Sequence, residues 1–509
     1  MKPGTTRILI AGAIAAGTSL LLGGCGSATD APLEKGSAAT RHYGDIAFEP
    51  CTLASGVSAG NVQAMCARFE VAEDRNRADG RRISLRLAWL PATEEGAATE
   101  DPVFFLAGGP GQSAVQVWPQ LDPAFKEVRK QRHVVLVDQR GTGGSNLLAC
   151  APRDDQAQLA TTPDASAIAD FARRCAEDAA GRADPRFYTT ADAIADLDAV
   201  RQAIGAAQVN LVGGSYGTRV AQQYAKAFPA HVRSIVLDGV APNDLVVGGE
   251  FAHTFEDALK LQASRCQQLP ACAARFPQDA RVQLASLVER LRQAPVQVEY
   301  RDPSSAQVKH GTVSADTVTG LAFMFSYMPQ TAALLPLVLD EASHGRYEPL
   351  MSLHDLMSRS MGDTMARGMQ WSVICAEDAD RYREDEATAG TLLGPDVARM
   401  FFAACASWPH GVAAEGFTEP LGGQVPALLL SGELDPVTPP RYGEQVVKAL
   451  ANGRHLVLKG QGHGTLSTGC TPRLLAQFLE SADARALDAS CLDKLAYVPP
   501  FTSFNGWEP

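Results

Sequence analysis

The chain has 509 residues, a formal net charge of −12 and a hydrophobic content of 46%. This length exceeds that of a minimal single-core domain, and the hydrophobic content is typical of a protein with an ordinary buried core. The acidic balance and the absence of a basic run argue against nucleic acid as a partner, because phosphate binding needs a net basic surface.

The first 25 residues are predicted to be a targeting segment. Lys2 and Arg7 form a charged start. An apolar stretch, residues 8–22, follows them and is too short to span a membrane comfortably. The following Leu-Gly-Gly-Cys resembles the lipobox of bacterial lipoproteins, so we expect cleavage before Cys25 and lipidation of its thiol. The alternative is an ordinary secretory signal with a chance cysteine. In either case we expect an exported protein, at the periplasmic side of an envelope membrane or secreted, in which residues 26–43 form a flexible tether.

The next segments predict an α/β sheet. Residues 82–90 alternate between apolar and polar side chains, as in a half-exposed edge strand. A helix is predicted over residues 191–204, where Thr189 and Asp192 have the spacing of a capping box. With helices between the strands, the sheet should be mostly parallel. Its further strands are predicted at apolar runs that start near residues 103, 134, 209, 235, 425 and 455.

A candidate nucleophile lies in residues 213–217, which read Gly-Gly-Ser-Tyr-Gly. They follow a short apolar strand and precede a helical pattern, which is the context of a nucleophile elbow. The outer glycines are needed there because a side chain would collide with the neighbouring strand or helix. We therefore expect Ser215 to present its hydroxyl at the carboxyl edge of the sheet.

Two loops upstream of Ser215 are predicted to support the site. The first, Ala-Gly-Gly-Pro-Gly at residues 107–111, follows a strand and would bring a bare backbone N–H to a developing oxyanion. We assign the two donors to Gly109 and Tyr216, and the alternative is that this loop is only a tight turn. In the second loop, Asp-Gln-Arg-Gly-Thr-Gly-Gly-Ser at residues 138–145, we expect a local ion pair between Asp138 and Arg140.

The downstream part of the chain supplies an acid and a base in the order Ser, Asp, His. Asp435 and His463 both lie on loops just after apolar runs, where open α/β sheets gather their functional groups. His463 would take the proton of Ser215 and later give it to the leaving group. Asp435 would hold the imidazole in the required tautomer and stabilise its charged form.

Five motifs in order carry a resemblance to a known family. They read AGGPG, DQRGTGGS, GGSYG followed by YAxxxPxxVRSIVLDGV, GELDPVTP and GHG. Together they resemble the proline iminopeptidase and tripeptidyl aminopeptidase family of serine peptidases, in its secreted branch with a TAP-like C-terminal segment. One departure is Ala107, where many members carry His, and this puts the fine tuning of the oxyanion loop in doubt.

The resemblance implies an α/β-hydrolase fold with an inserted helical cap. Residues 44–240 and 417–509 would form the hydrolase core, the latter being the TAP-like part. Residues 241–416 would form the cap, because helical periodicity replaces strand-like runs there. His253 and His410 lie in this segment and are interpreted as ordinary surface or packing residues.

An aminopeptidase must bind the free ammonium of its substrate, for which a carboxylate is the natural partner. The cap segment contains an apolar run, residues 371–376, that ends in two acids. Glu377 is our candidate for the ammonium ligand, and Asp378 is the second. The alternative is an exposed helix start at which the acids favour the helix dipole.

Eleven cysteines agree with an oxidising compartment. Removal of Cys25 leaves ten, and no Cys-x-x-Cys pair or close Cys/His cluster indicates zinc or another metal. Sequence alone does not determine the connectivity, and pairing of neighbours along the chain is a guess. That guess pairs Cys51 with Cys66, Cys150 with Cys175, Cys266 with Cys272, Cys375 with Cys405, and Cys470 with Cys491.

The sequence therefore predicts a lipid-anchored, disulfide-bonded serine hydrolase that needs no cofactor. Its expected activity is release of residues from peptide N-termini through an acyl-enzyme. A carboxylesterase or lipase with the same triad is the first alternative, because acyl chemistry is shared and specificity would lie in the cap. A noncatalytic envelope lipoprotein that binds peptides is the second, and the intact triad counts against it.

Overall fold

The structure is a computed structural model, and it describes residues 39–54, 60–94, 96, 98–150, 164–362 and 365–506. The predicted targeting segment, Cys25 and most of the predicted tether lie outside these residues. From Ala39 onward the chain forms one compact unit. Within the described ranges, no helix combines the length and the apolar character needed to cross a membrane.

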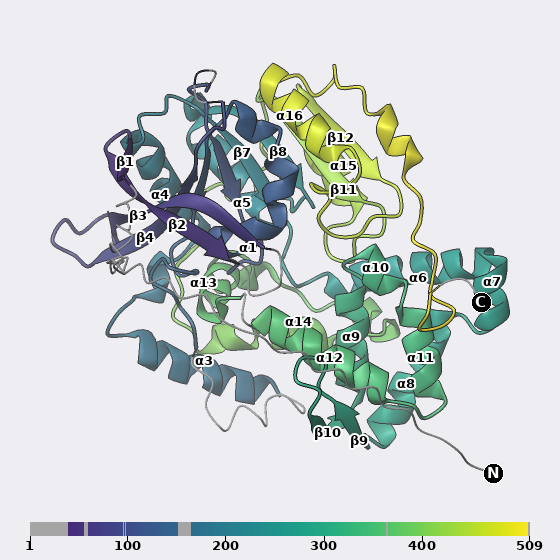
Figure 1. Cartoon of the computed structure of the whole chain (residues 1–509). Helices are drawn as coiled ribbons and strands as arrows, with labels where there is room; N and C mark the ends of the chain where they lie inside the picture. The colour runs from purple at the N-terminus through teal and green to yellow at the C-terminus, as the bar shows by residue number, and fades with distance from the viewer. Residues whose placement is uncertain are drawn as a thin grey trace, which may run out of the picture. The chain divides into compact units, whose positions relative to one another are not determined.

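A ten-stranded sheet organises this unit, in the strand order β1-β2-β3-β4-β6-β5-β7-β8-β11-β12 (Figure 1). The six strands from β6 to β12 are parallel, and β1 to β4 add an antiparallel extension at the β6 side. The strands are β1 Arg41–Tyr43, β2 Ile46–Ala54, β3 Asn61–Ala72, β4 Arg82–Leu90, β5 Val103–Leu106, β6 Val134–Val137, β7 Val209–Gly214, β8 Val232–Asp238, β11 Ala427–Gly432 and β12 Gly453–Leu458.

The mostly parallel α/β sheet confirms the predicted fold class, and two local predictions were wrong. Strand β4 is not an edge strand, because it lies between β3 and β6. Strands β2 and β3, which extend the sheet beyond β4, were not predicted from the sequence. Residues 41–43 do not belong to a tether, since β1 pairs with β2 and the Tyr43 ring lies 5.1 Å from that of Trp89.

Helices cover both faces of the parallel strands, as the alternation of apolar side chains requires. Along β5, Phe104 and Leu106 join the cluster that contains α4, α5 and α15, whereas Val103 and Phe105 join the cluster of α1 and α16. These helices are α1 Ala114–Leu121, α4 Thr190–Ala203, α5 Tyr216–Ala227, α15 Pro440–Val447 and α16 Thr471–Ser481. The capping box predicted for α4 is present, with Thr189 as the N-cap and Asp192 as its reciprocal partner.

A group of helices between β8 and β11 forms the cap (Figure 1). Its helices are α6 Phe251–Gln268, α7 Pro270–Arg275, α8 Ala280–Gln293, α9 Ala315–Phe325, α10 Pro329–Ala332, α11 Leu335–Ser343, α12 Glu348–Gly362, α13 Arg367–Glu377 and α14 Asp396–Phe402. Helices α6, α8, α9, α11 and α12 share an apolar core of their own, whereas α13 packs into the apolar cluster of the sheet helices α4 and α5.

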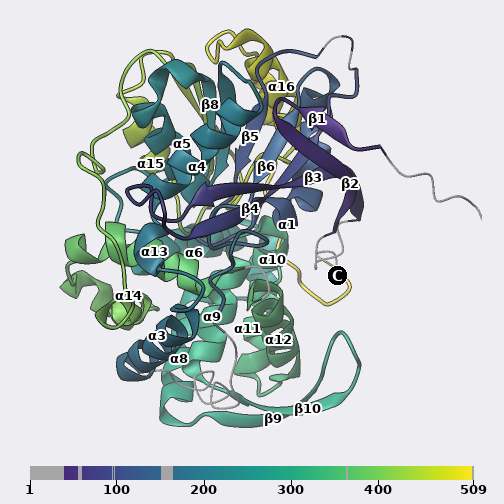
Figure 2. The same cartoon turned by 90° about the vertical axis from the view of Figure 1, so that its left-hand side faces the viewer.

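Two features of the cap differ from the sequence prediction. A hairpin of β9, Val296–Arg301, and β10, Val308–Val313, lies on the side away from the sheet (Figure 2). Helix α3, Ala165–Ala179, comes from the predicted N-terminal core but packs on α13 and α14, with the rings of Phe171 and Trp371 5.6 Å apart. Contacts across the cap boundary are therefore made by segments far apart in the sequence.

The ten cysteines other than Cys25 form five disulfides, with Cα–Cα distances from 5.2 to 6.3 Å. Each joins neighbouring cysteines along the chain, in the pairing that the sequence analysis guessed. Disulfides persist in oxidising compartments and are rare in the cytosol, so this is an exported protein. The pairs are Cys51–Cys66, Cys150–Cys175, Cys266–Cys272, Cys375–Cys405 and Cys470–Cys491.

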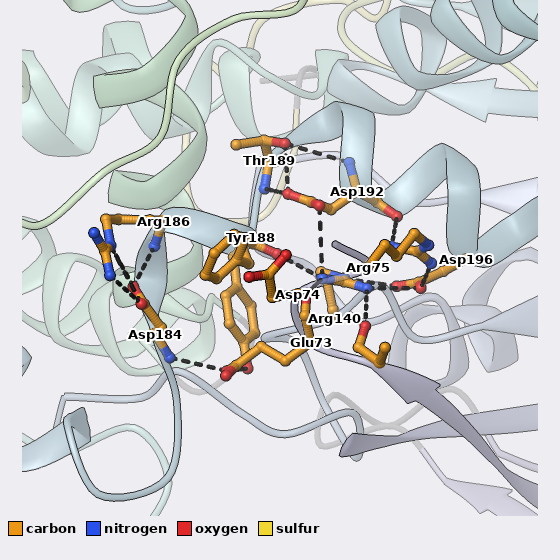
Figure 3. A network of polar contacts seen from close by, with 12 residues as sticks. Glu73, Asp74, Arg75, Arg140, Asp184, Arg186, Tyr188, Thr189, Asp192 and Asp196 are labelled. Atoms are coloured by element: carbon orange, nitrogen blue, oxygen red, sulfur yellow. Dashed lines mark hydrogen bonds and ion pairs between the residues drawn. The ribbon is translucent and has the colours of Figure 1, made fainter. Parts of the chain in front are cut away.

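The expected ion pair between Asp138 and Arg140 is not the one that forms. The guanidinium of Arg140 binds Asp196 of α4 through two contacts, of 2.7 and 2.8 Å, and donates to the carbonyl oxygens of Glu73 and Phe187 at 2.9 and 2.6 Å (Figure 3). Arg140 thereby joins the end of β3, the loop after β6 and α4. No local pattern predicts this pair, because its partners are 56 residues apart.

We expect this buried pair to contribute strongly to stability. The Arg140 side chain is fully buried and that of Asp196 is 3% exposed. Removal of one charge from a buried pair costs about 3–5 kcal/mol, and here Asp192, 3.8 Å from Arg140, compensates part of the remaining charge, so we expect a loss at the lower end. Asp196→Asn should therefore lower the free energy of unfolding, measured by urea denaturation, by roughly 3 kcal/mol. Glu177→Gln, in the exposed Arg173–Glu177 pair of α3, is the control and should leave the midpoint unchanged. Equal shifts for the two variants would contradict the assignment.

Candidate active site

Ser215 lies at the tight turn between β7 and α5, with φ 55° and ψ −125°. The turn is closely packed: a Cβ on Gly217 would lie 2.1 Å from the carbonyl oxygen of Leu106, and a Cβ on Gly213 would lie 2.3 Å from that of Gly217. Only glycine fits at either position, which is the steric role predicted for them. The turn holds Ser215 in a conformation that non-glycine residues rarely adopt, as nucleophile elbows do.

The structure brings the turn that contains Gly109 close to Ser215, and Tyr216 follows Ser215 directly in the chain. Tyr216 is the first residue of α5, so its N–H has no acceptor within the helix. The turn after β5 packs on the nucleophile, since a Cβ on Gly108 would lie 2.9 Å from the Ser215 Cβ. Gly109 follows with φ 106°, in the region that favours glycine. The assignment of the Gly109 and Tyr216 N–H groups as oxyanion donors stays a prediction.

Asp435 and His463 form a hydrogen-bonded pair. The Nδ1 of His463 lies 2.8 Å from Oδ2 of Asp435. The carboxylate also accepts from the Val437 N–H at 2.9 Å and from the N–H and hydroxyl of Thr438, each at 2.8 Å. With its Nδ1 proton donated to Asp435, the imidazole keeps Nε2 free to accept a proton from serine. Thr438 was missed by the sequence analysis, although it lies three residues after the acid in the same loop.

The charges of the pair stabilise each other. Burial would raise the pKa of Asp435, but the nearby His463 charge and hydrogen bonds hold that pKa below its ordinary value. Burial would lower the pKa of His463, but the charge and hydrogen bond of Asp435, with a further contribution from Asp238, raise it overall. His463 is therefore a stronger base than an isolated imidazole.

Asp238 is a second buried acid that the sequence analysis missed. It ends the apolar strand β8, and its carboxylate accepts from the Thr465 N–H at 2.7 Å, the Thr465 hydroxyl at 2.8 Å and the Leu466 N–H at 3.0 Å. It therefore fixes the loop that follows His463. A charged residue directly after the apolar run of residues 235–237 was the available signal.

The cap contacts the loops on both sides of Ser215. The Tyr327 carbonyl, just after α9, accepts from the His463 N–H at 2.7 Å, and the two rings meet edge to face at 5.3 Å. The Ala366 N–H, just before α13, donates to the Gly111 carbonyl at 2.9 Å. One cap segment thus binds the histidine loop and another binds the turn of the oxyanion donors.

The two acids nominated for the substrate ammonium are both buried, and their carboxylates bind protein donors. Glu377 is 3% exposed and binds Thr190, whereas Asp378 is 1% exposed and lies 3.1 Å from Arg219 and 2.6 Å from Arg381. The alternative of an exposed helix start was wrong, because Glu377 ends α13. Neither acid presents an open carboxylate in this arrangement, so ammonium binding by them stays a prediction.

His253 lies outside the triad. His253 binds Asp385 at 2.7 Å on an exposed part of the cap. The described ranges contain no group of three or more His, Cys, Asp or Glu residues that could hold a metal ion.

The raised pKa of His463 predicts where activity begins. Catalysis needs the neutral imidazole, so kcat/KM should rise with pH and reach half of its plateau above pH 6.5, the ordinary imidazole value. An aryl ester is the suitable substrate because it does not titrate in this range. Asp238→Asn should shift the half-point to lower pH, since it removes a charge that raises the histidine pKa while its amide can still bond Thr465. A flat profile would exclude His463 as the base.

A pair of variants separates Asp435 from Glu433, two residues earlier. Glu433 is held elsewhere: it accepts from the Gly460 N–H at 2.8 Å and from the Tyr497 hydroxyl. Asp435→Asn should lower kcat by a factor on the order of 10⁴, because the amide favours the wrong imidazole tautomer. Glu433→Gln should change kcat little in the same assay. Reversed magnitudes would move the triad acid to Glu433.

Two family models match the chain. The model described as the alpha/beta hydrolase fold matches residues 101–295, and the model of the TAP-like protein matches residues 390–491. The first match includes Ser215 and both proposed oxyanion donors, and the second includes Asp435 and His463.

Known proteins similar to the chain include two peptidases. Serine protease Hip1 of Mycobacterium tuberculosis is 26% identical over 462 residues, which are 84% of this chain and 87% of that protein. Tripeptidyl aminopeptidase of Streptomyces lividans is 28% identical over 188 residues, covering 34% of this chain and 35% of that protein. Among solved structures, proline iminopeptidase of Mycobacterium smegmatis matches 82% of this chain and 99% of its own, with 17% identity and a TM-score of 0.40.

Proposed function

We propose that this chain, which belongs to the α/β-hydrolase family of serine peptidases, releases residues or short peptides from the N-termini of peptide substrates. Peptidase activity and peptide substrates are those of the family. The preference for the amino end of the substrate is the step that the proposal adds. We further propose that Cys25 carries a lipid that anchors the chain to an envelope membrane, on the strength of the lipobox-like residues before it.

In the proposed reaction, Ser215 attacks the scissile carbonyl while Nε2 of His463 takes the hydroxyl proton. The developing oxyanion accepts hydrogen bonds from the backbone N–H groups of Gly109 and Tyr216. Collapse of the tetrahedral intermediate breaks the peptide bond, and His463 gives its proton to the departing amine. Water then attacks the acyl-enzyme by the same route and regenerates Ser215. Asp435 holds the imidazole and stabilises its charged form throughout.

The observation that carries the exopeptidase proposal is the attachment of the cap to both loops beside Ser215. We expect a substrate that extends past Ser215 on both sides to meet the contacts of Tyr327 with His463 and of Ala366 with Gly111. A chain terminus needs entry from one side only. The similarity to a tripeptidyl aminopeptidase favours the amino terminus over the carboxyl terminus.

Blocking the substrate N-terminus tests the proposal. An enzyme that binds the free ammonium should hydrolyse an N-acetylated peptide anilide at least ~30-fold more slowly in kcat/KM than the free peptide, since loss of one partner of a buried charge pair costs about 2–5 kcal/mol. Ser215→Ala provides the blank, and an aryl ester without an amino group reports the acyl chemistry alone. Equal rates on free and acetylated peptides would replace the aminopeptidase proposal by an endopeptidase, and a high rate on the ester alone would favour a carboxylesterase or lipase.

A further inference from the structure

Glu377 extends from the end of the cap helix α13 to the first residue of α4 in the core. One carboxylate oxygen accepts from the Thr190 N–H at 2.7 Å, and the other lies 2.9 Å from the Thr190 hydroxyl. All three groups are buried. The contact is therefore a cap-to-core connection shielded from water, where hydrogen bonds to a charged group are strong.

The connection continues to the residue after the nucleophile. The Thr190 hydroxyl lies 2.6 Å from the hydroxyl of Tyr216, which also accepts from the Gln139 side-chain amide at 3.3 Å. Gln139 belongs to the loop after β6. A chain of four side chains thus runs from that loop through Tyr216 and Thr190 to Glu377.

A count of protons shows that an ionised Glu377 completes this chain. Gln139 donates to Tyr216, Tyr216 donates to the Thr190 hydroxyl, and both the hydroxyl and the N–H of Thr190 donate to the carboxylate. Every hydroxyl hydrogen in the chain then has an acceptor. If Glu377 instead donated its own proton to Thr190, the chain would reverse, and the Tyr216 hydroxyl would keep an acceptor only if the Gln139 amide turned its oxygen toward it. An uncharged glutamine at residue 377, whose oxygen accepts from the Thr190 N–H, presents its amide hydrogens to the Thr190 hydroxyl and favours this reversed direction.

The environment of Glu377 supports control by its charge. Burial raises the pKa of Glu377 to about 7, opposed by the charge of Arg219 on α5 and by the Thr190 hydrogen bonds, and reinforced by the charge of Asp378. Arg219 and Arg381 are bound to Asp378, so no cation pairs directly with Glu377 in the described contacts. In those contacts, the polar partners of the Glu377 carboxylate are the N–H and the hydroxyl of Thr190.

The position of Tyr216 matters because its N–H is one of the two proposed oxyanion donors. Its ring is buried, with 2% of the residue exposed, and its hydroxyl is fixed at the far end by the chain just described. A side chain held at its tip restrains the first turn of α5 and hence the direction of that N–H. Donor placement is critical, since removal of one oxyanion donor from an enzyme lowers kcat by roughly 10²–10³.

We propose that Glu377 and Thr190 are positioning residues for the oxyanion hole, holding Tyr216 through its hydroxyl so that the docked cap aligns the N–H of the residue next to Ser215. The inference rests on the serine chemistry of the proposed function and not on its preference for peptide N-termini. It gives Glu377 a role different from the ammonium ligand predicted from the sequence. The two roles predict different effects of Glu377→Gln on the hydrolysis of esters and of free and acetylated peptides.

Side-chain variants that leave the backbone donor in place test the proposal. Tyr216→Phe and Thr190→Val remove one hydroxyl each with little change of shape, and Glu377→Gln reverses the chain. Each should lower kcat for an aryl ester by about 5- to 30-fold with KM changed by less than about twofold, because misplacement of a donor costs less than its loss. The rate is expressed per active site, titrated with a fluorophosphonate, so that misfolded protein does not count.

The double variant Tyr216→Phe with Glu377→Gln provides the stricter measurement. If both act through one chain, its kcat should lie within about twofold of the lower single variant. Thr190→Ser, which keeps the hydroxyl, should recover most of the kcat lost in Thr190→Val. The shared pathway would be overturned if the losses of kcat in the two single variants multiplied in the double variant. It would also be overturned if Thr190→Ser did not recover kcat.

The peptide assay separates the positioning role from ammonium binding. In a positioning role, Glu377→Gln lowers the rates on free and acetylated peptides by the same factor and leaves their ratio unchanged. If that ratio instead collapses while the ester rate is unaffected, Glu377 binds the ammonium and the positioning proposal falls. If the parent enzyme shows no preference between the two peptides, the aminopeptidase proposal fails, and the ester measurements still decide the role of Glu377.

Discussion

The close approach of three backbones at the nucleophile determines the rest of the site. The Leu106 carbonyl at the end of β5 lies where a side chain on Gly217 would have to be, so β5, β7 and α5 meet without intervening side chains. This packing brings the turn that contains Gly109 close to Ser215 and Tyr216, the residues that the proposed reaction needs together. The electrostatic part of catalysis thus depends on a steric condition that only glycine satisfies. The histidine and its acid reach the same place because the parallel strands all end at one edge.

Three buried carboxylates at strand ends organise the loops around this edge. Asp138, after β6, accepts from the N–H of Val115 at 3.0 Å and so holds the segment that follows the oxyanion turn. Asp238, at the end of β8, holds the loop after His463, and Asp435, after β11, holds the imidazole itself. Each acid has its lone pairs taken up by backbone or hydroxyl donors, which compensates for its burial. One of the three takes part in the chemistry, and the other two keep the participating loops in place.

Local signals in the sequence were enough to predict the sheet, the elbow and the α4 capping box, because each depends on residues within about one turn or one strand of the chain. The sequence was also enough to nominate Asp435 and His463, which are separated by 28 residues but follow neighbouring strands. Sequence patterns did not predict contacts in which tertiary packing determines the partner of a side chain. The choice of Asp196 over Asp138 by Arg140, and the contact of Glu377 with a threonine of α4, leave no periodic or local trace. The interior place of β4 likewise depended on strands that sequence patterns did not reveal.

The hydrogen bonds from the His463 N–H to the Tyr327 carbonyl and from the Ala366 N–H to the Gly111 carbonyl involve only main-chain atoms. They persist when side chains on either partner are exchanged, provided that the backbone path is kept. Substitutions on the cap can therefore leave these two contacts unchanged, provided that they spare Glu377, whose side chain carries the proposed alignment of the oxyanion hole. One scaffold can in this way acquire new substrates through changes elsewhere in the cap that leave its reaction intact.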